Sequence, residues 1–176
     1  MSGHNKWSQI RHQKGKTDAK KSQVFGKLGK LVAEEARKAR GNRGAPGLKT
    51  AIERARGVNM PSESIERAIK KATEEGARAM ESLMYEAYGP GGCAILIEVL
   101  TDNRNRASQE IKHALFERGG NLAGQGAAVW AFVKSNEGWS AQTTVLLSDT
   151  DVASLEMLVD ALEAHEDVRG VFTNAE

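Results

Sequence analysis

The most constraining feature of this sequence is a change in hydrophobic period near Gly76. Before it, apolar residues recur every three or four positions, as they do on one face of a helix. After it, residues 93–100 are nearly all apolar and rich in β-branched side chains, which is typical of a strand buried in a sheet. The chain is therefore expected to be α+β, with the helices first and the sheet after them.

The N-terminal half is expected to contain a flexible basic arm and a small three-helix domain. Residues 1–21 show little periodic apolar pattern and form the arm. Residues 22–76 carry three helical patterns, of which the third opens at Pro61. Gly26 and Gly29 weaken the first helix, each by about 1 kcal/mol relative to Ala.

The C-terminal part, residues 77–176, is expected to be one α/β domain. Its order of elements, βαββαβ, is that of a ferredoxin-like domain, in which two helices cover one face of an antiparallel sheet. The predicted elements are strands over 93–100, 129–133, 144–147 and 168–173, and helices over 104–117 and 151–164.

Charge is strongly segregated along the chain. The first 71 residues hold 18 Lys and Arg against 6 Asp and Glu, a net charge of +12. The remaining 105 residues hold 7 against 17, a net charge of −10. A basic segment attracts phosphate whatever the distant balance is, so nucleic acid is the first expected partner. The alternative is that the acidic half neutralises the basic half within the molecule.

Candidate nucleic-acid contacts lie in the arm and the first helix. A flexible basic arm can follow a phosphate backbone with salt-sensitive affinity. The indole of Trp7 could stack on an unpaired base, an interaction worth roughly 1–3 kcal/mol. The alternative is a solvated tail with Trp7 docked on its own domain. The candidates are His4, Lys6, Trp7, Arg11, His12, Lys14, Lys16, Lys20, Lys21, Lys27 and Lys30.

A second candidate contact follows the strand at 93–100. Asp102 or Asn103 can cap the next helix, but two arginines in its first turn oppose the macrodipole, at a cost of roughly a few tenths of a kcal/mol each. A phosphate held by Arg104 and Arg106 at this helix N-terminus would remove that penalty. The alternative is a structural loop in which Asp102 pairs with one of the arginines.

Catalysis is not expected. The Gly-Pro-Gly-Gly turn at 89–92 precedes its strand, and no glycine-rich loop ends in Gly-Lys-Ser/Thr, so neither a Rossmann fingerprint nor a P-loop is present. The four histidines are scattered, without carboxylates at metal-ligand spacing. We expect no enzyme activity, metal, cofactor or small-molecule substrate.

The sequence favours a cytoplasmic protein without a membrane role. Cys93 is the only cysteine, which excludes an intramolecular disulfide and fits a reducing compartment. The N-terminus lacks a signal-peptide pattern, and the longest apolar stretch is too short to span a bilayer. A monomer is expected, and head-to-tail association of the two charged ends is the alternative.

Five motifs occur in order between residues 3 and 122. They are GHNKWSQIRH at 3–12, NMP at 59–61, YEAYGPGG at 85–92, LTDNRNR at 100–106 and GGNL at 119–122. Together they resemble the YebC family, which includes mitochondrial translational activators of cytochrome c oxidase. Members of that family usually have a third α/β domain inserted after the strand matching 129–133. Here a loop over 134–142 takes its place, which puts any role of that domain in doubt.

The resemblance implies a non-enzymatic factor in gene expression, in one of two roles. The first is a translation factor that binds the ribosome and its rRNA and eases elongation through difficult sequences such as proline runs. The second is a transcriptional regulator that binds DNA. An arm with Trp7 and histidines suits irregular RNA and unpaired bases, and no helix carries an evident set of base-reading side chains. The ribosome is therefore the favoured partner.

Overall fold

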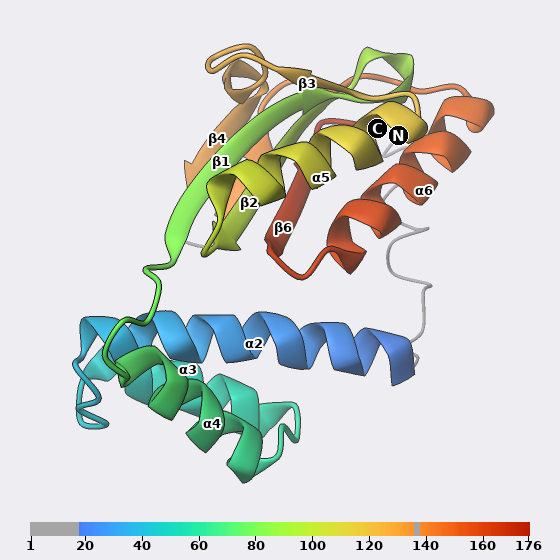
Figure 1. Cartoon of the computed structure of the whole chain (residues 1–176). Coiled ribbons are helices and arrows are strands. Elements are labelled where there is room, and N and C mark those ends of the chain that lie inside the picture. The colour runs from blue at the N-terminus through green and yellow to red at the C-terminus, as the bar shows by residue number, and fades with distance from the viewer. Residues whose placement is uncertain (1–17, 136–137) are drawn as a thin grey trace.

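The computed structural model describes residues 18–135 and 138–176. Its first elements are three helices, α2 Asp18–Lys38, α3 Pro46–Gly57 and α4 Ser62–Thr73, which we call the helical region (Figure 1). Both α3 and α4 pack on α2, and apolar side chains of all three helices form one cluster. Within the described residues, no helix is both long and apolar enough to cross a membrane.

Helix α2 begins earlier than expected. It starts at Asp18, so residues 18–21, which were expected in the arm, belong to the helix. An acidic residue in the first turn complements the macrodipole, and Ala and Lys are good helix formers. Gly26 and Gly29 do not interrupt α2, which runs unbroken from Asp18 to Lys38. The rest of the predicted arm, residues 1–17, lies outside the described residues.

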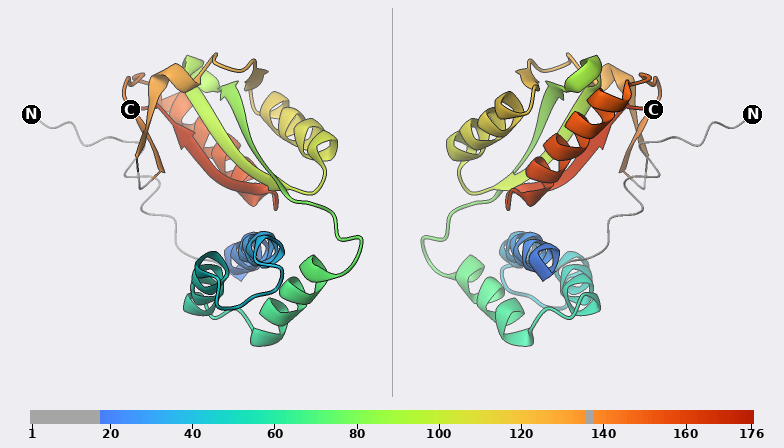
Figure 2. Two further views of the ribbon diagram at one scale, coloured as in Figure 1. Left: turned by 90° about the vertical axis from the view of Figure 1, so that its left-hand side faces the viewer. Right: turned by 90° about the vertical axis from the view of Figure 1, so that its right-hand side faces the viewer.

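The sheet region, residues 81–135 and 138–176, contains one main sheet. Strands β3, β1, β2 and β6 lie in that order and are all antiparallel to their neighbours. Helices α5 and α6 cover one face of this sheet (Figure 2). The elements are β1 Glu81–Tyr88, η1 Pro90–Gly92, β2 Ala94–Thr101, α5 Arg104–Glu117, β3 Asn121–Ala123, η2 Val129–Ala131, β4 Phe132–Ser135, β5 Gly138–Ala141, α6 Asp149–Ala164 and β6 Val168–Thr173.

Strand β2 is buried on both faces, as its composition predicts. Ile95, Ile97 and Val99 pack with apolar residues of α5 and α6 in the largest cluster of the molecule. On the opposite face, Leu96 packs with Phe132 and residues of η2. This strand is therefore the centre around which both layers of the sheet region are built.

The α+β class is confirmed, but the order of strands is not βαββαβ. The main sheet begins with an additional strand, β1, and its order is β1, β2, α5, β3, α6, β6. The sequence pattern does not reveal β1, because that strand is half exposed and interrupted by Glu86. Of the strand expected at 129–133, the first part is the short 3-10 helix η2. The strand expected at 144–147 makes only a single bridge, between Val145 and Ala175.

The segment expected to be a loop at 134–142 is instead mostly a hairpin. Strands β4 and β5 pair there in a sheet of their own. The Trp139 indole Nε1 donates a hydrogen bond of 3.2 Å to Glu98 Oε1 on β2, and Lys134 Nζ lies 5.5 Å from the ring centroid. The first contact anchors the hairpin to the main sheet, and the second joins its two strands. Two strands of only four residues do not signal this outcome in the sequence.

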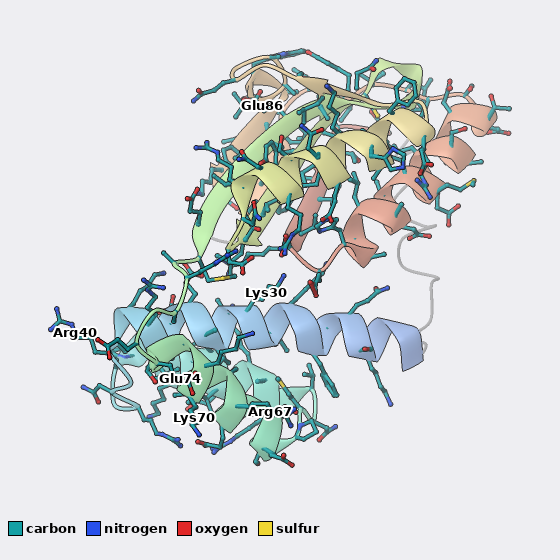
Figure 3. All side chains as sticks on the ribbon, viewed as in Figure 1. Lys30, Arg40, Arg67, Lys70, Glu74 and Glu86 are labelled. Carbon is teal, nitrogen blue, oxygen red and sulfur yellow. The ribbon has the colours of Figure 1, made fainter. Side chains whose placement is uncertain are left out.

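Glu86 is a buried carboxylate that holds the loop before η2 against β1 (labelled in Figure 3). Its Oε1 accepts a hydrogen bond from the backbone N–H of Gly126 at 2.6 Å. Its Oε2 accepts hydrogen bonds from the N–H groups of Ala128 and Val129 at 2.6 and 2.8 Å. Burial alone would raise the pKa of Glu86, but these three donors outweigh burial and hold the pKa below its ordinary value.

The substitution Glu86→Gln is expected to lower the free energy of unfolding by about 1–3 kcal/mol, because an amide NH2 would face backbone donors. A depressed pKa stabilises the fold above the ordinary glutamate pKa, and that contribution is lost as the pH falls through the folded-state value. Urea unfolding should therefore show a difference between variant and wild type at neutral pH that shrinks in acid. Glu81→Gln, at the exposed start of the same strand, should stay within about 0.5 kcal/mol of wild type at both pH values.

Candidate nucleic-acid interface

Exposed cations gather on the outer surface of the helical region. Each helix carries two basic residues in its last turn, where they also complement the macrodipole. Figure 3 shows Arg40 and Lys70 on this outer surface. Among the described residues, no hydrogen-bond or ion-pair partner is found for the exposed side chains of Arg40, Lys49, Arg54 and Lys70. We call these four residues the outer cations.

Other cations of the helical region are already neutralised locally. Arg43 forms a two-pronged ion pair with Glu66, and its Nη1 lies 2.8 Å from Glu66 Oε1. Lys38 Nζ lies 2.9 Å from a carboxylate oxygen of Glu34 and 2.9 Å from one of Glu35. These pairs show that the positive charge available to a partner is smaller than the residue count suggests.

The opposite side of α2 faces the sheet region and carries two of the predicted contacts. Lys30, on this side in Figure 3, donates a hydrogen bond to Asp167 Oδ1, and its Nζ lies 3.6 Å from Glu166 Oε1. Lys27 is partly buried, which lowers its pKa, and the nearby charge of Glu163 opposes that effect. Both lysines therefore face acidic residues of the sheet region. On this side of α2, the acidic half of the chain neutralises part of the basic half, which is the alternative given in the sequence analysis.

Asp167, just before β6, is the most highly connected carboxylate of this contact. Its side chain has no exposed surface. Besides Lys30, it accepts hydrogen bonds of 3.0 Å from Thr101 Oγ1 and 3.0 Å from Arg106 Nη2. Burial alone would raise the pKa of Asp167, but the hydrogen bonds from Lys30 and Arg106 hold that pKa below its ordinary value. The carboxylate is thus kept ionised away from water.

Arg104 and Arg106 differ in what they contact. Arg106 Nη2 also lies 3.2 Å from Asp102 Oδ1, and its Nε lies 3.9 Å from Glu110 Oε2, so the arginine pairs with three carboxylates. Asn103 caps α5 by accepting a hydrogen bond from the Arg106 N–H at 3.1 Å. Arg104 is exposed and has no side-chain partner within the described part of the chain. For Arg106, the structure therefore agrees with the alternative of a structural loop in which Asp102 pairs with an arginine. Arg104 is exposed and accessible to an anion.

A cleft of about 790 Å³ lies between α2, α4, the linker at 74–80 and the start of α5. Gly26 and Gly29 line it on the α2 side; a Cβ at Gly26 would meet no atom within 4 Å, whereas one at Gly29 would lie 3.6 Å from Met60 Cε. Lys71 and Arg78 also line it, together with acidic residues of the linker. The cleft has mixed charge and is bounded on one side by Lys30 and Arg106.

A possible metal-binding cluster borders the same contact but does not suit a cation. Oxygen and nitrogen atoms of Glu110, His165 and Asp167 lie within 4.8 Å of one another. Lys30 and Arg106 already supply positive charge to Asp167, and the Asp167 N–H donates a hydrogen bond to His165 Nδ1 at 3.1 Å. A metal ion there would be repelled by both side chains and would compete for that ring nitrogen.

The predicted contacts thus fall into three groups. Lys30 and Arg106 meet at Asp167, and Lys27 faces the same acidic side of the sheet region. Lys21 and Arg104 are exposed. The side chains of the remaining candidates, from His4 to Lys20, lie outside the described residues. Sequence reasoning missed Asp167, which is 137 positions from Lys30 and belongs to no local pattern.

Comparison with known proteins agrees with this architecture. A family model described as the TACO1/YebC protein N-terminal domain matches residues 5–75, and one described as the TACO1/YebC second and third domain matches residues 80–137. The chain is a two-part α+β protein and belongs to the TACO1/YebC family. The predicted family is therefore confirmed.

Curated relatives share this family but are longer than the matched part. A probable transcriptional regulatory protein of Petrotoga mobilis is 51% identical over 134 residues, which cover 75% of this chain and 53% of the relative. One of Halothermothrix orenii is 42% identical over 167 residues, covering 93% and 64%. The chain thus spans about half to two thirds of the length of these relatives. A crystal structure of the conserved hypothetical protein Aq1575 of Aquifex aeolicus matches with a TM-score of 0.83 and 29% identity, covering 97% of this chain and 96% of that one.

Arg106→Gln is expected to reduce stability by about 1 kcal/mol or more, because it removes a donor from the buried Asp167 carboxylate. Partial exposure of the arginine keeps the cost toward the low end of such losses. Arg104→Gln removes the same charge from the same turn without a partner and should change stability by less than about 0.5 kcal/mol. Chemical unfolding of the two variants measures the difference, and equal losses would contradict the assigned roles.

Proposed function

We propose that this protein is a non-enzymatic factor in gene expression that binds rRNA on the ribosome. The observation that carries the proposal is the set of four outer cations, which are exposed and lack partners within the described residues. The predicted arm precedes them in the sequence, and its 21 residues include six Lys and Arg and one acidic residue. Such a surface suits a phosphate backbone, because each contact with a phosphate releases condensed counterions.

The orientation of the charges supports one face as the contact. Lys27 and Lys30 face the acidic side of the sheet region, so that side of α2 is the less suitable one for a polyanion. The outer cations lie at the ends of helices and in the turn after α2, where exposed side chains can reach a curved backbone. We infer that rRNA meets the helical region on its outer surface and that the sheet region lies farther from the RNA.

RNA is favoured over duplex DNA for a chemical reason. Within the sequence of the arm, Trp7 and two histidines accompany the cations, and aromatic rings stack on unpaired bases, which structured RNA offers more often than a duplex. A more specific role, in elongation through difficult sequences such as proline runs, follows from the family resemblance. We also propose that the protein acts in the cytoplasm and as a monomer.

DNA binding in transcription is the second candidate, and it has its own support. The Petrotoga and Halothermothrix relatives are both named probable transcriptional regulatory proteins. The same outer cations would contact a duplex backbone without reading its sequence. The two candidates differ in what competes for binding: a transcriptional regulator should prefer one duplex sequence by ~10³-fold or more over others.

Substituting three outer cations together, as Arg40→Gln, Lys49→Gln and Arg54→Gln, is expected to weaken binding to an rRNA fragment at every salt concentration. The slope of log affinity against log salt should become shallower by about 2, because roughly three phosphate contacts are lost. Fluorescence anisotropy across a salt series measures this slope. Lys112→Gln, an exposed cation on α5, is the control and should leave the slope unchanged; an unchanged slope in the triple variant would exclude the outer surface as the contact.

Removing residues 1–17, which leaves α2 intact, should abolish most association with ribosomes in sucrose gradients at low salt. Trp7→Ala alone should weaken binding by roughly 1–3 kcal/mol if the indole stacks on a base. The wild-type protein should sediment with ribosomal particles and dissociate as salt is raised. Absence of the wild-type protein from ribosomal fractions at low salt, together with sequence-selective duplex binding, would favour the transcriptional role.

A further inference from the structure

The helical and sheet regions touch through charged groups and not through a shared core. Of the three apolar clusters found in the described residues, one belongs to the helical region and two to the sheet region. The contacts between the regions include Lys30 with Asp167 and Glu166, and Arg169 Nη1 at 3.6 Å from Glu34 Oε2. Interfaces this polar usually permit relative motion of the parts they join.

We propose that Asp167, Lys30 and Arg106 form an ion-pair latch that holds the two regions together, and that the regions separate when the latch is broken. Asp167 lies just before β6 and Arg106 on α5, so both belong to the sheet region. Lys30 belongs to α2 and is the part of the latch that comes from the helical region. Breaking the contact between Lys30 and Asp167 therefore removes the cross-region ion pair whose carboxylate is fully buried, and leaves the longer pair between Arg169 and Glu34.

The exposure of the latch makes it sensitive to ions. The Asp167 side chain is fully buried, but the side chain of Lys30 is 22% exposed and that of Arg106 is 41% exposed. A mobile anion can therefore reach the cations without first uncovering the carboxylate. Salt screens such partly exposed pairs more strongly as its concentration rises, because the Debye length falls from about 10 Å at 0.1 M to about 3 Å at 1 M.

The linker between the regions has the properties of a hinge. It spans residues 74–80, and Gly76 within it adopts a positive φ of 83°, with open space on the side where other residues carry a Cβ. Arg37 Nη1 donates a hydrogen bond of 2.6 Å to the Ala77 carbonyl, which fixes the linker to α2 beside the cleft. Rotation about Gly76 would change the separation of α2 and α5 without disturbing either apolar core.

Opening the latch would change the charge offered to a polyanion. Lys30 would no longer be neutralised by Asp167, whereas Arg106 would stay paired with Asp167 because both belong to the sheet region. Lys30 lines the cleft that also contains Lys71 and Arg78, so a phosphodiester chain and the Asp167 carboxylate would compete for this lysine. This consequence rests on the proposed function, whereas the latch itself does not.

Distance measurements between two spin labels test the latch without RNA. Thr50→Cys on α3 and Gln109→Cys on α5 place labels on exposed positions of the two regions. The native Cys93 is buried, and burial raises the pKa of its thiol to about 11, so it should not react. With the latch intact at low salt, one narrow distance distribution is expected. Asp167→Asn should broaden and lengthen it, and so should raising the salt to about 1 M.

The control for lost negative charge is Glu81→Gln, at an exposed position at the start of β1, which should leave the distribution narrow. Because Asp167→Asn could also weaken the fold, Lys30→Gln is measured in parallel. That variant leaves Thr101 and Arg106 on the carboxylate and removes the contacts that Lys30 makes with Asp167 and Glu166. A narrow, unchanged distribution in a folded Lys30→Gln variant, at low and high salt, would overturn the latch.

Titration with poly(U) RNA then connects the latch to binding. If RNA competes with Asp167, it should broaden the wild-type distribution, and Asp167→Asn should bind RNA about fivefold or more tightly than Glu81→Gln does. Opening by substitution without any RNA binding would support the latch and count against the proposed function. RNA binding of equal strength in both variants, with an unchanged distance, would support the function and overturn competition at the latch.

Discussion

The Asp167 carboxylate is removed from solvent, yet side chains from three separate elements donate hydrogen bonds to it. A buried charge is tolerable only when its partners replace the hydration that it loses. Thr101 and Arg106 supply this within the sheet region, and Lys30 completes it from α2. The relative placement of the two regions therefore depends on satisfying one anion, since no apolar cluster among the described residues is shared between them.

This interaction changes the meaning of the charge division along the chain. A net charge of +12 followed by one of −10 suggests a single polar molecule with two distinct ends. In the fold, the side of α2 with Lys27 and Lys30 faces acidic residues before β6, so part of the division is cancelled internally. The outer cations escape that cancellation. The segregation thus does two things at once: it joins the regions on one side of α2 and leaves positive charge exposed on the other.

How much could be predicted from sequence depends on how local the determinants are. The helices and β2 were predictable, because continuous apolar patterns specify them. β1 and the β4–β5 hairpin were not, because half-exposed or very short strands are defined by the neighbours they pair with. At the site, the arginines near α5 drew attention through their unfavourable place at a helix N-terminus. Asp167, the partner of Arg106, gave no such signal, because only the folded chain brings it to Lys30.

The β4–β5 hairpin has a geometric consequence for how such a chain can vary in length. Its two strands enter and leave side by side, and Trp139 fastens the pair to β2 through Glu98. A segment inserted between the strands begins and ends at neighbouring points, so segments of different length can be accommodated without changing the main sheet. The hairpin is thus a natural junction at which a whole folded module can be present in one protein and absent from another, while the core stays the same.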